Sequence, residues 1–319
     1  FMQGYDNVHI ITPQHFLGRT FKSLWRTYAL TALSNKLNLD VFHGLSNELP
    51  ANIDAFKGRK MVTIHDLIFM RYPHYYKSID RAIYKRKFKT ACVHADTVVA
   101  ASNQTAEDLI SFFGIDRGKI KVVYQGCDRQ FGHRVGDKER QEVQAKYKLP
   151  SSFIVCIGTI EQRKNQLTVL RAFHRANVGL NLVFVGRQTE YAEQLHQYIA
   201  EHQLQEKVKF IEGAAFTDFP AFYQMAALSV YASEFEGFGI PVLEGLKSST
   251  NMIVANTSSL PEVGGDAVTY FETGNEQQLS GLIEKMLHSD FNTAKVSKQL
   301  AKFDTGLLMQ QLNTLYQPR

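Results

Sequence analysis

Short apolar runs separated by amphipathic stretches make up most of this chain, and they are clearest in its second half. Leu167, Leu170, Ala172 and Phe173 have the spacing of a helix that buries one face. Each such stretch is flanked by short apolar runs of the length expected for buried strands. These runs predict strands at residues 153–158, 181–186, 208–213, 228–233, 252–256 and 267–271. The alternation of strand and helix predicts a parallel α/β domain.

The first half contains the same kinds of segment. It predicts helical stretches that begin at Phe16 and Ile79, and strands at residues 8–12, 40–44, 61–65, 97–102 and 119–124. We therefore expect an α/β protein with two Rossmann-like domains, residues 1–133 and 134–302, whose parallel sheets face a cleft. The charged, glycine-containing segment 126–150 is the expected hinge.

Composition narrows the class of protein. The chain has 319 residues, of which 44% are hydrophobic and 21% charged, and its formal net charge is +5. It has no apolar run of about 18 residues and no charged N-terminal segment followed by an apolar one. We therefore expect neither a membrane span nor a signal peptide, and a cytoplasmic location. The scattered cysteines, Cys92, Cys127 and Cys156, predict reduced thiols and no metal site.

Residues 236–244 combine two carboxylates, a glycine pair and a helix start. They follow a predicted strand, and Pro241 suits the first turn of a helix. The glycines allow backbone N–H groups to approach an anion at the helix N-terminus. Glu236 and Glu244 are unsuited to a phosphate but can accept hydrogen bonds from hydroxyls, so the segment favours a nucleotide sugar. The alternative is a solvated loop glutamate and a first-turn glutamate favoured by the helix dipole.

A second segment places two cations before a helix. Arg163 and Lys164 follow the strand that ends near Gly158 and precede the helical pattern. Cations at a helix N-terminus cost roughly 0.3–1 kcal/mol each unless an anion is bound there. The segment therefore favours an anion site. The alternative is that both side chains reach solvent or pair with Glu161.

Together these segments resemble the retaining GT-B glycosyltransferases of family 4. The seven residues between Glu236 and Glu244 match the EX7E signature of that family. The resemblance rests on residues 158–165, 233–244 and 258–263 and runs from about Val62 to the C-terminus. It implies a helix at 303–319 that crosses back to the first domain. We expect the first β-α units of the family to be missing, because residues 1–6 lead directly into a predicted strand that is typical of a later position.

The resemblance also implies roles for individual residues. Arg163 and Lys164 would contact the diphosphate, Glu244 the ribose, and Glu236 the hydroxyls of the donor sugar. The backbone of residues 237–239 would contact sugar or phosphate. The donor-binding set that the resemblance implies is Gly158, Arg163, Lys164, Glu236, Gly237, Phe238, Gly239 and Glu244. Glu236 is also one of the two expected catalytic residues.

His65 is the other expected catalytic residue. It ends the apolar run 61–65, and polar groups at strand ends are where α/β proteins bind their ligands. It resembles the strand-ending histidine of family 4, which lies near the transferred sugar. The alternatives are a histidine satisfied by hydrogen bonds in the core or one paired with Asp66.

The resemblance implies a retaining glycosyltransferase of surface polysaccharide biosynthesis. The expected donor is GDP-mannose or a UDP-sugar, with mannose as the first choice, and the acceptor is a glycan or a lipid-linked glycan. We expect no cofactor and no metal, because the sequence contains no DxD motif and the cations can stabilise the diphosphate. The alternatives are a catalytically silent binder of nucleotide sugars or glycans, and a GT-B nucleotide-sugar epimerase.

Aromatic and basic residues also alternate in one segment of the first half. Residues 71–77 and the following cations, Arg81, Lys85, Arg86, Lys87 and Lys89, suit peripheral contact with an anionic membrane. The alternative is a solvated helix face, because the net charge is modest. We expect no nucleic-acid binding, since no recognised module accompanies the charge.

Overall fold

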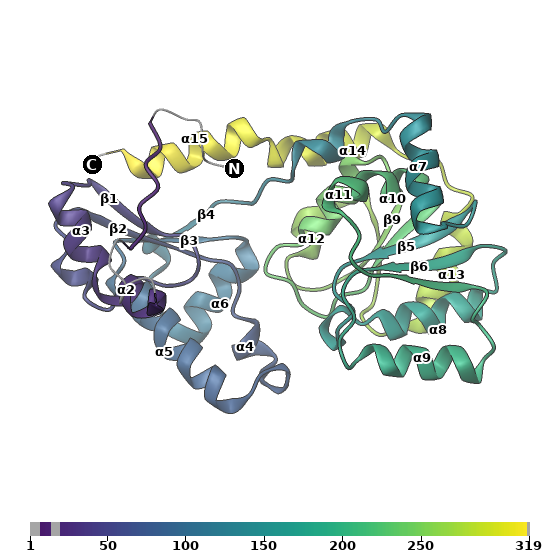
Figure 1. Ribbon diagram of the computed structural model, residues 1–319, viewed down its shortest axis with the longest axis horizontal. Coiled ribbons are helices and arrows are strands. Elements are labelled where there is room, and N and C mark those ends of the chain that lie inside the picture. Colours follow the sequence, from purple (N-terminus) through teal and green to yellow (C-terminus); the bar gives the residue numbers. More distant parts are fainter. Residues whose placement is uncertain (1–6, 14–19, 318–319) are drawn as a thin grey trace.

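The computed structural model describes residues 7–13 and 20–317. Two α/β parts are joined by the chain segment between β4 (Ile120–Val122) and α7 (Asp137–Tyr147) and by the last helix, α15 (Thr305–Tyr316). This helix runs from the second part back to the first (Figure 1). Both sheets consist of parallel strands, so the predicted α/β class with two parallel sheets is confirmed. Within the described residues, none of the helices has the length and apolar character that crossing a membrane requires.

The first sheet has four strands in the order β1-β2-β3-β4. Its strands are β1 (Val41–Gly44), β2 (Arg59–Ile64), β3 (Thr97–Ala100) and β4 (Ile120–Val122). The helices of this part are α2 (Lys22–Tyr28), α3 (Leu30–Lys36), α4 (Ile68–Arg71), α5 (Ser78–His94) and α6 (Asn103–Phe113). Met61, Val62 and Ile64 of β2 are buried, and the chain emerges from the sheet at His65, where the polar residues begin.

The strand predicted at residues 8–12 is wrong. Residues 8–13 have no regular secondary structure, and Ile10 and Ile11 are 60% and 46% exposed. An apolar run becomes a strand only where a neighbouring strand supplies hydrogen bonds, and β1 pairs only with β2 among the described residues. The predicted start of the next helix, Phe16, lies among residues 14–19, which are outside the described residues.

The second sheet has six strands in the order β10-β9-β8-β5-β6-β7. All six strands predicted for this half are confirmed: β5 (Phe153–Ile157), β6 (Asn181–Val185), β7 (Val208–Ile211), β8 (Leu228–Tyr231), β9 (Met252–Ala255) and β10 (Thr269–Phe271). The direction of strand progression reverses between β5 and β8. Such a reversal at the carboxyl edge is where open α/β sheets have their ligand crevice.

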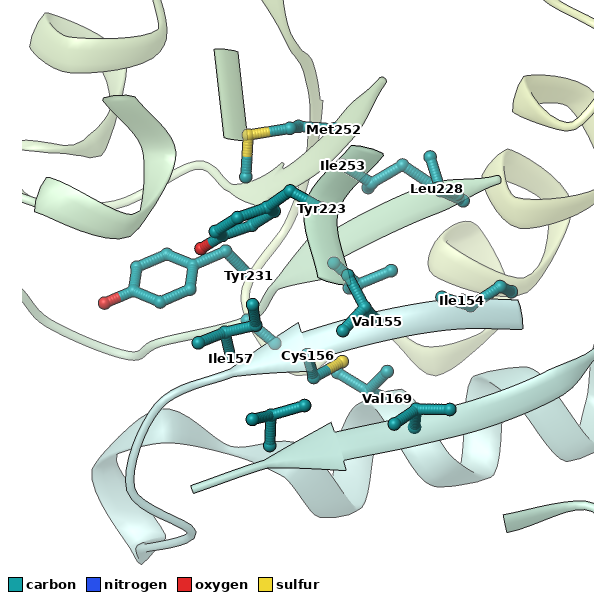
Figure 2. Close-up of a cluster of buried hydrophobic side chains, with 14 of the residues drawn as sticks. Ile154, Val155, Cys156, Ile157, Val169, Tyr223, Leu228, Tyr231, Met252 and Ile253 are labelled. Atoms are coloured by element: carbon teal, nitrogen blue, oxygen red, sulfur yellow. The ribbon is translucent and has the colours of Figure 1, made fainter. Parts of the chain in front are cut away.

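Helices surround the second sheet and close its core. They are α7 (Asp137–Tyr147), α8 (Gln166–Ala176), α9 (Ala192–Glu201), α10 (Phe219–Met225), α11 (Ile240–Lys247), α12 (Leu260–Gly264), α13 (Glu276–Met286) and α14 (Thr293–Leu300). Two tyrosines lie at the edge of this core, Tyr223 and Tyr231, and their hydroxyls point away from the aliphatic side chains (Figure 2). The edge of the core is thus polar where the crevice begins.

The segment predicted as a hinge, residues 126–150, contains helix α7. The aromatic ring of Tyr147 packs on Phe222 at 5.1 Å, so this helix belongs to the second part. At the other end of the chain, α15 contacts the first sheet. His43 Nδ1 and the Tyr316 hydroxyl lie 2.6 Å apart, and Arg59 donates to the carbonyl of Leu315 at 2.5 Å.

Candidate functional site

The loop after β5 positions the two cations at the crevice. Gly158 has φ 140°, and the backbone then forms a 3₁₀ turn, Gln162–Lys164. Asn165 has a left-handed conformation (φ 53°), from which α8 starts. Arg163 and Lys164 therefore lie immediately before the N-terminus of α8, where the sequence predicts them.

One carboxylate oxygen gathers both cations. Glu236 Oε1 accepts hydrogen bonds from Arg163 at 2.8 Å, from Lys164 Nζ at 2.6 Å and from the Tyr231 hydroxyl at 3.0 Å. Lys164 Nζ also lies 2.7 Å from the Tyr231 hydroxyl. We call these four side chains the Glu236 cluster. The pairing of the carboxylate expected beside the sugar with the cations expected on the diphosphate could not be predicted from the sequence.

The Glu236 cluster is largely shielded from water. The side chains of Glu236, Lys164 and Arg163 are 12%, 13% and 19% exposed. Burial opposes ionisation of Glu236, but Lys164 and Arg163 outweigh it and lower the pKa of the carboxyl below its usual range. Arg163 also pairs with Glu161 at 2.7 Å, which is one of the alternatives that the sequence left open. The carboxylate is thus ionised and serves as the anion for both cations.

The glycine loop that follows β8 lies against the first part of the fold. A Cβ atom at Gly237 would overlap the carbonyl oxygen of His65, so only glycine fits there. The Thr105 hydroxyl lies 3.1 Å from the His65 carbonyl and 3.4 Å from the Gly237 carbonyl. Gly239 has φ 113° and precedes α11, with Pro241 in the first turn. The loop therefore joins the two α/β parts at the position of His65.

Glu244 occupies a different environment from Glu236. It projects from α11 and accepts a hydrogen bond from the Tyr223 hydroxyl at 3.3 Å. Burial raises the pKa of Glu244 to about 7. Two carboxylates of one motif therefore differ in charge state near neutral pH, because only Glu236 has cations as direct partners.

Both nitrogens of the His65 ring have partners. The side-chain amide nitrogen of Gln125 lies 2.8 Å from Nδ1, and the Leu45 carbonyl lies 2.8 Å from Nε2. The backbone N–H of His65 donates to Asn47 Oδ1 at 2.8 Å. The ring therefore has a hydrogen-bonded environment, beside the glycine loop, which is one of the alternatives stated for it in the sequence analysis.

Asp66 is a nearby carboxylate that sequence reasoning considered only as a partner for His65. Its Oδ1 instead accepts a hydrogen bond from the Ile68 backbone at 3.1 Å. Burial raises the pKa of Asp66, and the charges of Arg163 and Glu236 act on it in opposite directions. The signal in the sequence was its position directly after a strand-ending histidine.

Two further contacts between the parts were not predicted from the sequence. Tyr75 donates a hydrogen bond to the carboxylate of Glu234. Glu262 accepts from the backbone N–H groups of Asn103 and Gln104, each at 2.9 Å. Glu262 thereby places a negative charge at the N-terminus of α6, where the helix dipole favours it.

A cavity of about 680 Å³ lies beside the Glu236 cluster. Residues 74–76 of the first part form one side, and residues 161–163 and 187–191 of the second part form the other. Arg163 belongs both to the cavity and to the cluster. Among the described residues there is no group of three or more His, Cys, Asp or Glu side chains arranged to hold a metal ion.

Known proteins resemble this chain over both halves. Residues 137–303 match the family described as Glycosyl transferases group 1, and residues 3–131 match the one described as Glycosyltransferase Family 4. O-antigen chain mannosyltransferase B of Escherichia coli is 26% identical over 256 residues, which are 78% of this chain and 66% of that protein. O-antigen chain mannosyltransferase RfbU of Salmonella typhimurium is 23% identical over 79% of this chain and 67% of its own length. The match thus spans about two thirds of each relative.

Solved structures share the fold. HepE of Anabaena in complex with UDP has a TM-score of 0.76 at 18% identity, covering 97% of this chain and 85% of that one. A glycosyltransferase from Rickettsia africae has a TM-score of 0.74, also at 18% identity, covering 97% of this chain and 83% of its own. At these identities the similarity establishes the two-domain architecture of the chain.

Proposed function

This chain belongs to the Glycosyl transferases group 1 family and has the GT-B fold, and we propose that it moves a hexose from a nucleotide diphosphate sugar to a glycan or lipid-linked acceptor. The observation that carries this proposal is the Glu236 cluster. Two cations at a helix N-terminus, held by one carboxylate, form an anion site with a displaceable internal anion.

In the proposed reaction, the donor diphosphate takes the place of Glu236 on Arg163 and Lys164. The bond between the anomeric carbon and the phosphate oxygen breaks, and an acceptor hydroxyl attacks from the same face of the sugar. The acceptor proton passes to the leaving phosphate, so configuration is retained. The protein stabilises the charge that develops on the diphosphate and orients the donor sugar, with no metal required.

The remaining site residues receive roles in the same scheme. The freed Glu236 carboxylate accepts hydrogen bonds from the hydroxyls of the donor sugar. Glu244 accepts from the ribose, and Gly158 leaves room for the backbone beside the diphosphate. His65 contributes its carbonyl and its ring beside Gly237, where both parts of the fold meet.

Mannose is our choice for the transferred sugar. Two of the relatives are named as O-antigen chain mannosyltransferases, which supports mannose and a place in polysaccharide assembly. A structural neighbour was solved with UDP, so a UDP-sugar is the alternative donor. A thermal-shift panel of GDP, UDP, ADP and their sugar conjugates tests the choice. A selective shift with GDP-mannose is expected, and a selective shift with a UDP-sugar would exclude mannose from GDP-mannose as the donor.

The second candidate is a catalytically silent nucleotide-sugar binder. The observation that favours it is the same cluster, because both cations already have a buried counterion. Donor hydrolysis separates the two candidates. Slow release of free hexose from the donor in water is expected of a transferase, whereas binding without any hydrolysis or transfer would establish the silent binder.

Contact with an anionic membrane belongs to the same proposal. On α5, Ile79 is 73% exposed and Ile83 is 46% exposed, and Lys85, Arg86 and Lys89 are exposed nearby. Apolar side chains among cations suit the interface of an anionic bilayer. Sedimentation with liposomes of increasing anionic content should increase binding, and reversing the charge at Lys85 and Arg86 should reduce it. Equal binding to neutral liposomes would refute this contact.

A further inference from the structure

Phe235 is a buried aromatic residue that lies outside both hydrophobic cores. It is 3% exposed, yet it belongs to neither of the two clusters of buried apolar side chains. Two of its neighbours come from the first part of the fold. The Tyr72 ring lies 5.6 Å from the Phe235 ring, and the guanidinium carbon of Arg71 lies 5.9 Å from the centre of that ring. Phe235 of the second part is thus buried against the first part.

A buried carboxylate holds Arg71 in place. Asp108 of α6 is fully buried, and its Oδ1 accepts from Arg71 Nε at 3.0 Å and from Gln104 Nε2 at 2.9 Å. Arg71 Nη2 donates to the same oxygen. The guanidinium also lies 5.5 Å from the centre of the Phe112 ring. An arginine that contacts two aromatic rings and a buried carboxylate has a fixed orientation, because each of these contacts is directional.

The neighbouring tyrosines hold the residue before Phe235. The Tyr72 hydroxyl donates to the carbonyl of Glu234 at 3.4 Å, and the Tyr75 hydroxyl donates to the Glu234 carboxylate. The rings of Tyr72 and Tyr75 stack with their centres 5.7 Å apart. The first part therefore fixes positions 234 and 235 through a cation, through ring contacts and through hydrogen bonds.

Positions 234–236 also provide partners for Arg163. Its guanidinium donates to the Phe235 carbonyl at 2.9 Å and to Glu236 Oε1 at 2.8 Å. The backbone N–H of Glu234 donates to the Arg163 carbonyl at 2.8 Å. In the function that we propose, a diphosphate takes the place of Glu236. The Phe235 carbonyl and Glu161 are then the partners that keep Arg163 oriented.

From these contacts we propose that Arg71 is a positioning residue for the donor site and acts through Phe235. Arg71 and Tyr72 fix the ring of Phe235, and the carbonyl of the same residue orients Arg163 towards the diphosphate. A cation that is oriented in advance binds its ligand more tightly, because less freedom is lost on binding. The inference rests on the proposed function, since it takes the ligand of Arg163 to be the donor diphosphate.

The alternative is that Arg71 stabilises the first part alone, as the counterion of Asp108. Two variants separate these roles. Phe235→Leu removes the ring and leaves the ion pair of Arg71 with Asp108 intact. Arg71→Gln combined with Asp108→Asn removes both charges together, because loss of Arg71 alone would leave a buried carboxylate without a counterion.

The first test is calorimetric titration of the whole chain with GDP, UDP and ADP and with the matching monophosphates. For the diphosphate that binds the wild-type chain, Phe235→Leu and the charge-removing variant should each raise the Kd about fivefold, the factor expected for one lost cation–π contact. The Kd of the monophosphate should rise less, because Arg163 is the expected partner of the diphosphate. Arg117→Gln, another exposed arginine of the first part, is the matched control and should change neither value.

The second test combines the substitutions in one chain. If Arg71 acts through Phe235, adding Phe235→Leu to the charge-removing variant should leave the Kd of the diphosphate at about five times the wild-type value. Independent effects would multiply to about 25-fold, and that result would overturn the proposal.

The outcomes separate this inference from the proposed function. Diphosphate binding by the wild-type chain together with an unchanged Kd in Phe235→Leu would overturn the positioning role alone. This variant keeps Asp108 paired, so it decides the question even where the charge-removing variant does not fold. Absence of diphosphate binding and of donor hydrolysis in the wild-type chain would overturn the proposed function itself.

Discussion

Replacing Glu236 by glutamine should tighten the binding of a nucleoside diphosphate while slowing turnover. In the structure, Glu236 Oε1 is the anion that holds both Arg163 and Lys164. In the function that we propose, a diphosphate competes with this carboxylate for the same two cations. Glutamine has nearly the same size but no charge, so the cations of the variant lack their strongest internal partner.

The magnitude follows from the partners that remain. Removing one member of a buried ion pair costs about 3–5 kcal/mol. Arg163 keeps Glu161, whereas Lys164 keeps only the Tyr231 hydroxyl, so we expect a loss near the lower limit, about 3 kcal/mol of unfolding free energy. If a bound diphosphate recovers half of this cost, its affinity rises about tenfold. Turnover should fall by about a hundredfold or more, because the donor sugar loses a charged partner.

Calorimetric titration with GDP and UDP measures the affinity, and thermal unfolding with and without nucleotide measures the stability. Glu272→Gln, an exposed glutamate of the same part, is the matched control and should change neither quantity. The double variant Lys164→Gln with Glu236→Gln should regain stability and lose the tighter binding. A diphosphate affinity that falls in parallel with turnover in Glu236→Gln would refute the reasoning, since Glu236 would then be helping the diphosphate.

Three other predictions follow from single residues. Burial raises the pKa of Glu244 to about 7. Between about pH 4.5 and pH 7 the folded chain therefore keeps a proton that the unfolded chain has released. The free energy of unfolding should fall by about 3 kcal/mol as the pH rises through this range. Urea unfolding at pH 5 and pH 7.5 should lose most of this slope in Glu244→Gln, and an unchanged slope would assign it elsewhere. Glu262→Gln should speed amide hydrogen exchange at the start of α6 roughly fivefold. This factor corresponds to a cost of about 1 kcal/mol for weakening the contact of a carboxylate with a helix N-terminus. Unchanged exchange would show that Glu262 does not hold the two parts together. Gly237→Ala should reduce turnover more than about tenfold, because the added Cβ meets the His65 carbonyl. Gly281 has open space around it, so Gly281→Ala is the control and should retain full turnover. Equal turnover in both variants would contradict the close approach of Gly237 to the His65 carbonyl.

The strands of the second sheet can be predicted from the sequence because most of them are short, buried and apolar. β5 and β9 are buried at every residue and consist of apolar side chains only, and β8 is equally buried, with Ser229 among apolar neighbours. The first half is harder. Residues 8–12 include Val8, Ile10 and Ile11 but have no regular structure, because strand formation depends on a neighbour that a local pattern cannot reveal.

Helix α7 shows the opposite difficulty. It lies within the segment predicted as a hinge because its sequence is strongly polar, and Val143 is its only buried residue. Its residues are good helix formers, and Tyr147 at its end fixes it to Phe222. Such a helix has too narrow an apolar stripe to be recognised by periodicity.

The composition of the candidate site could be predicted, but its pairing could not. The sequence places Arg163, Lys164 and Glu236 each at a loop that follows a strand. Arg163 and Glu236 are 73 positions apart in the chain, and only the neighbouring position of β5 and β8 in the sheet brings these loops together. Tyr231 was read only as part of a strand, although its hydroxyl completes the cluster.

The pairing resolves a conflict between stability and function. A donor site needs two cations that are unpaired at the moment of binding, yet two buried cations without an anion would destabilise the empty site. Glu236, together with Glu161 on Arg163, supplies this negative charge. In the function that we propose, a diphosphate replaces Glu236 on the two cations and releases its carboxylate beside the donor sugar. Binding of the diphosphate and recognition of the sugar would then be coupled through one side chain, and Glu236→Gln should separate them.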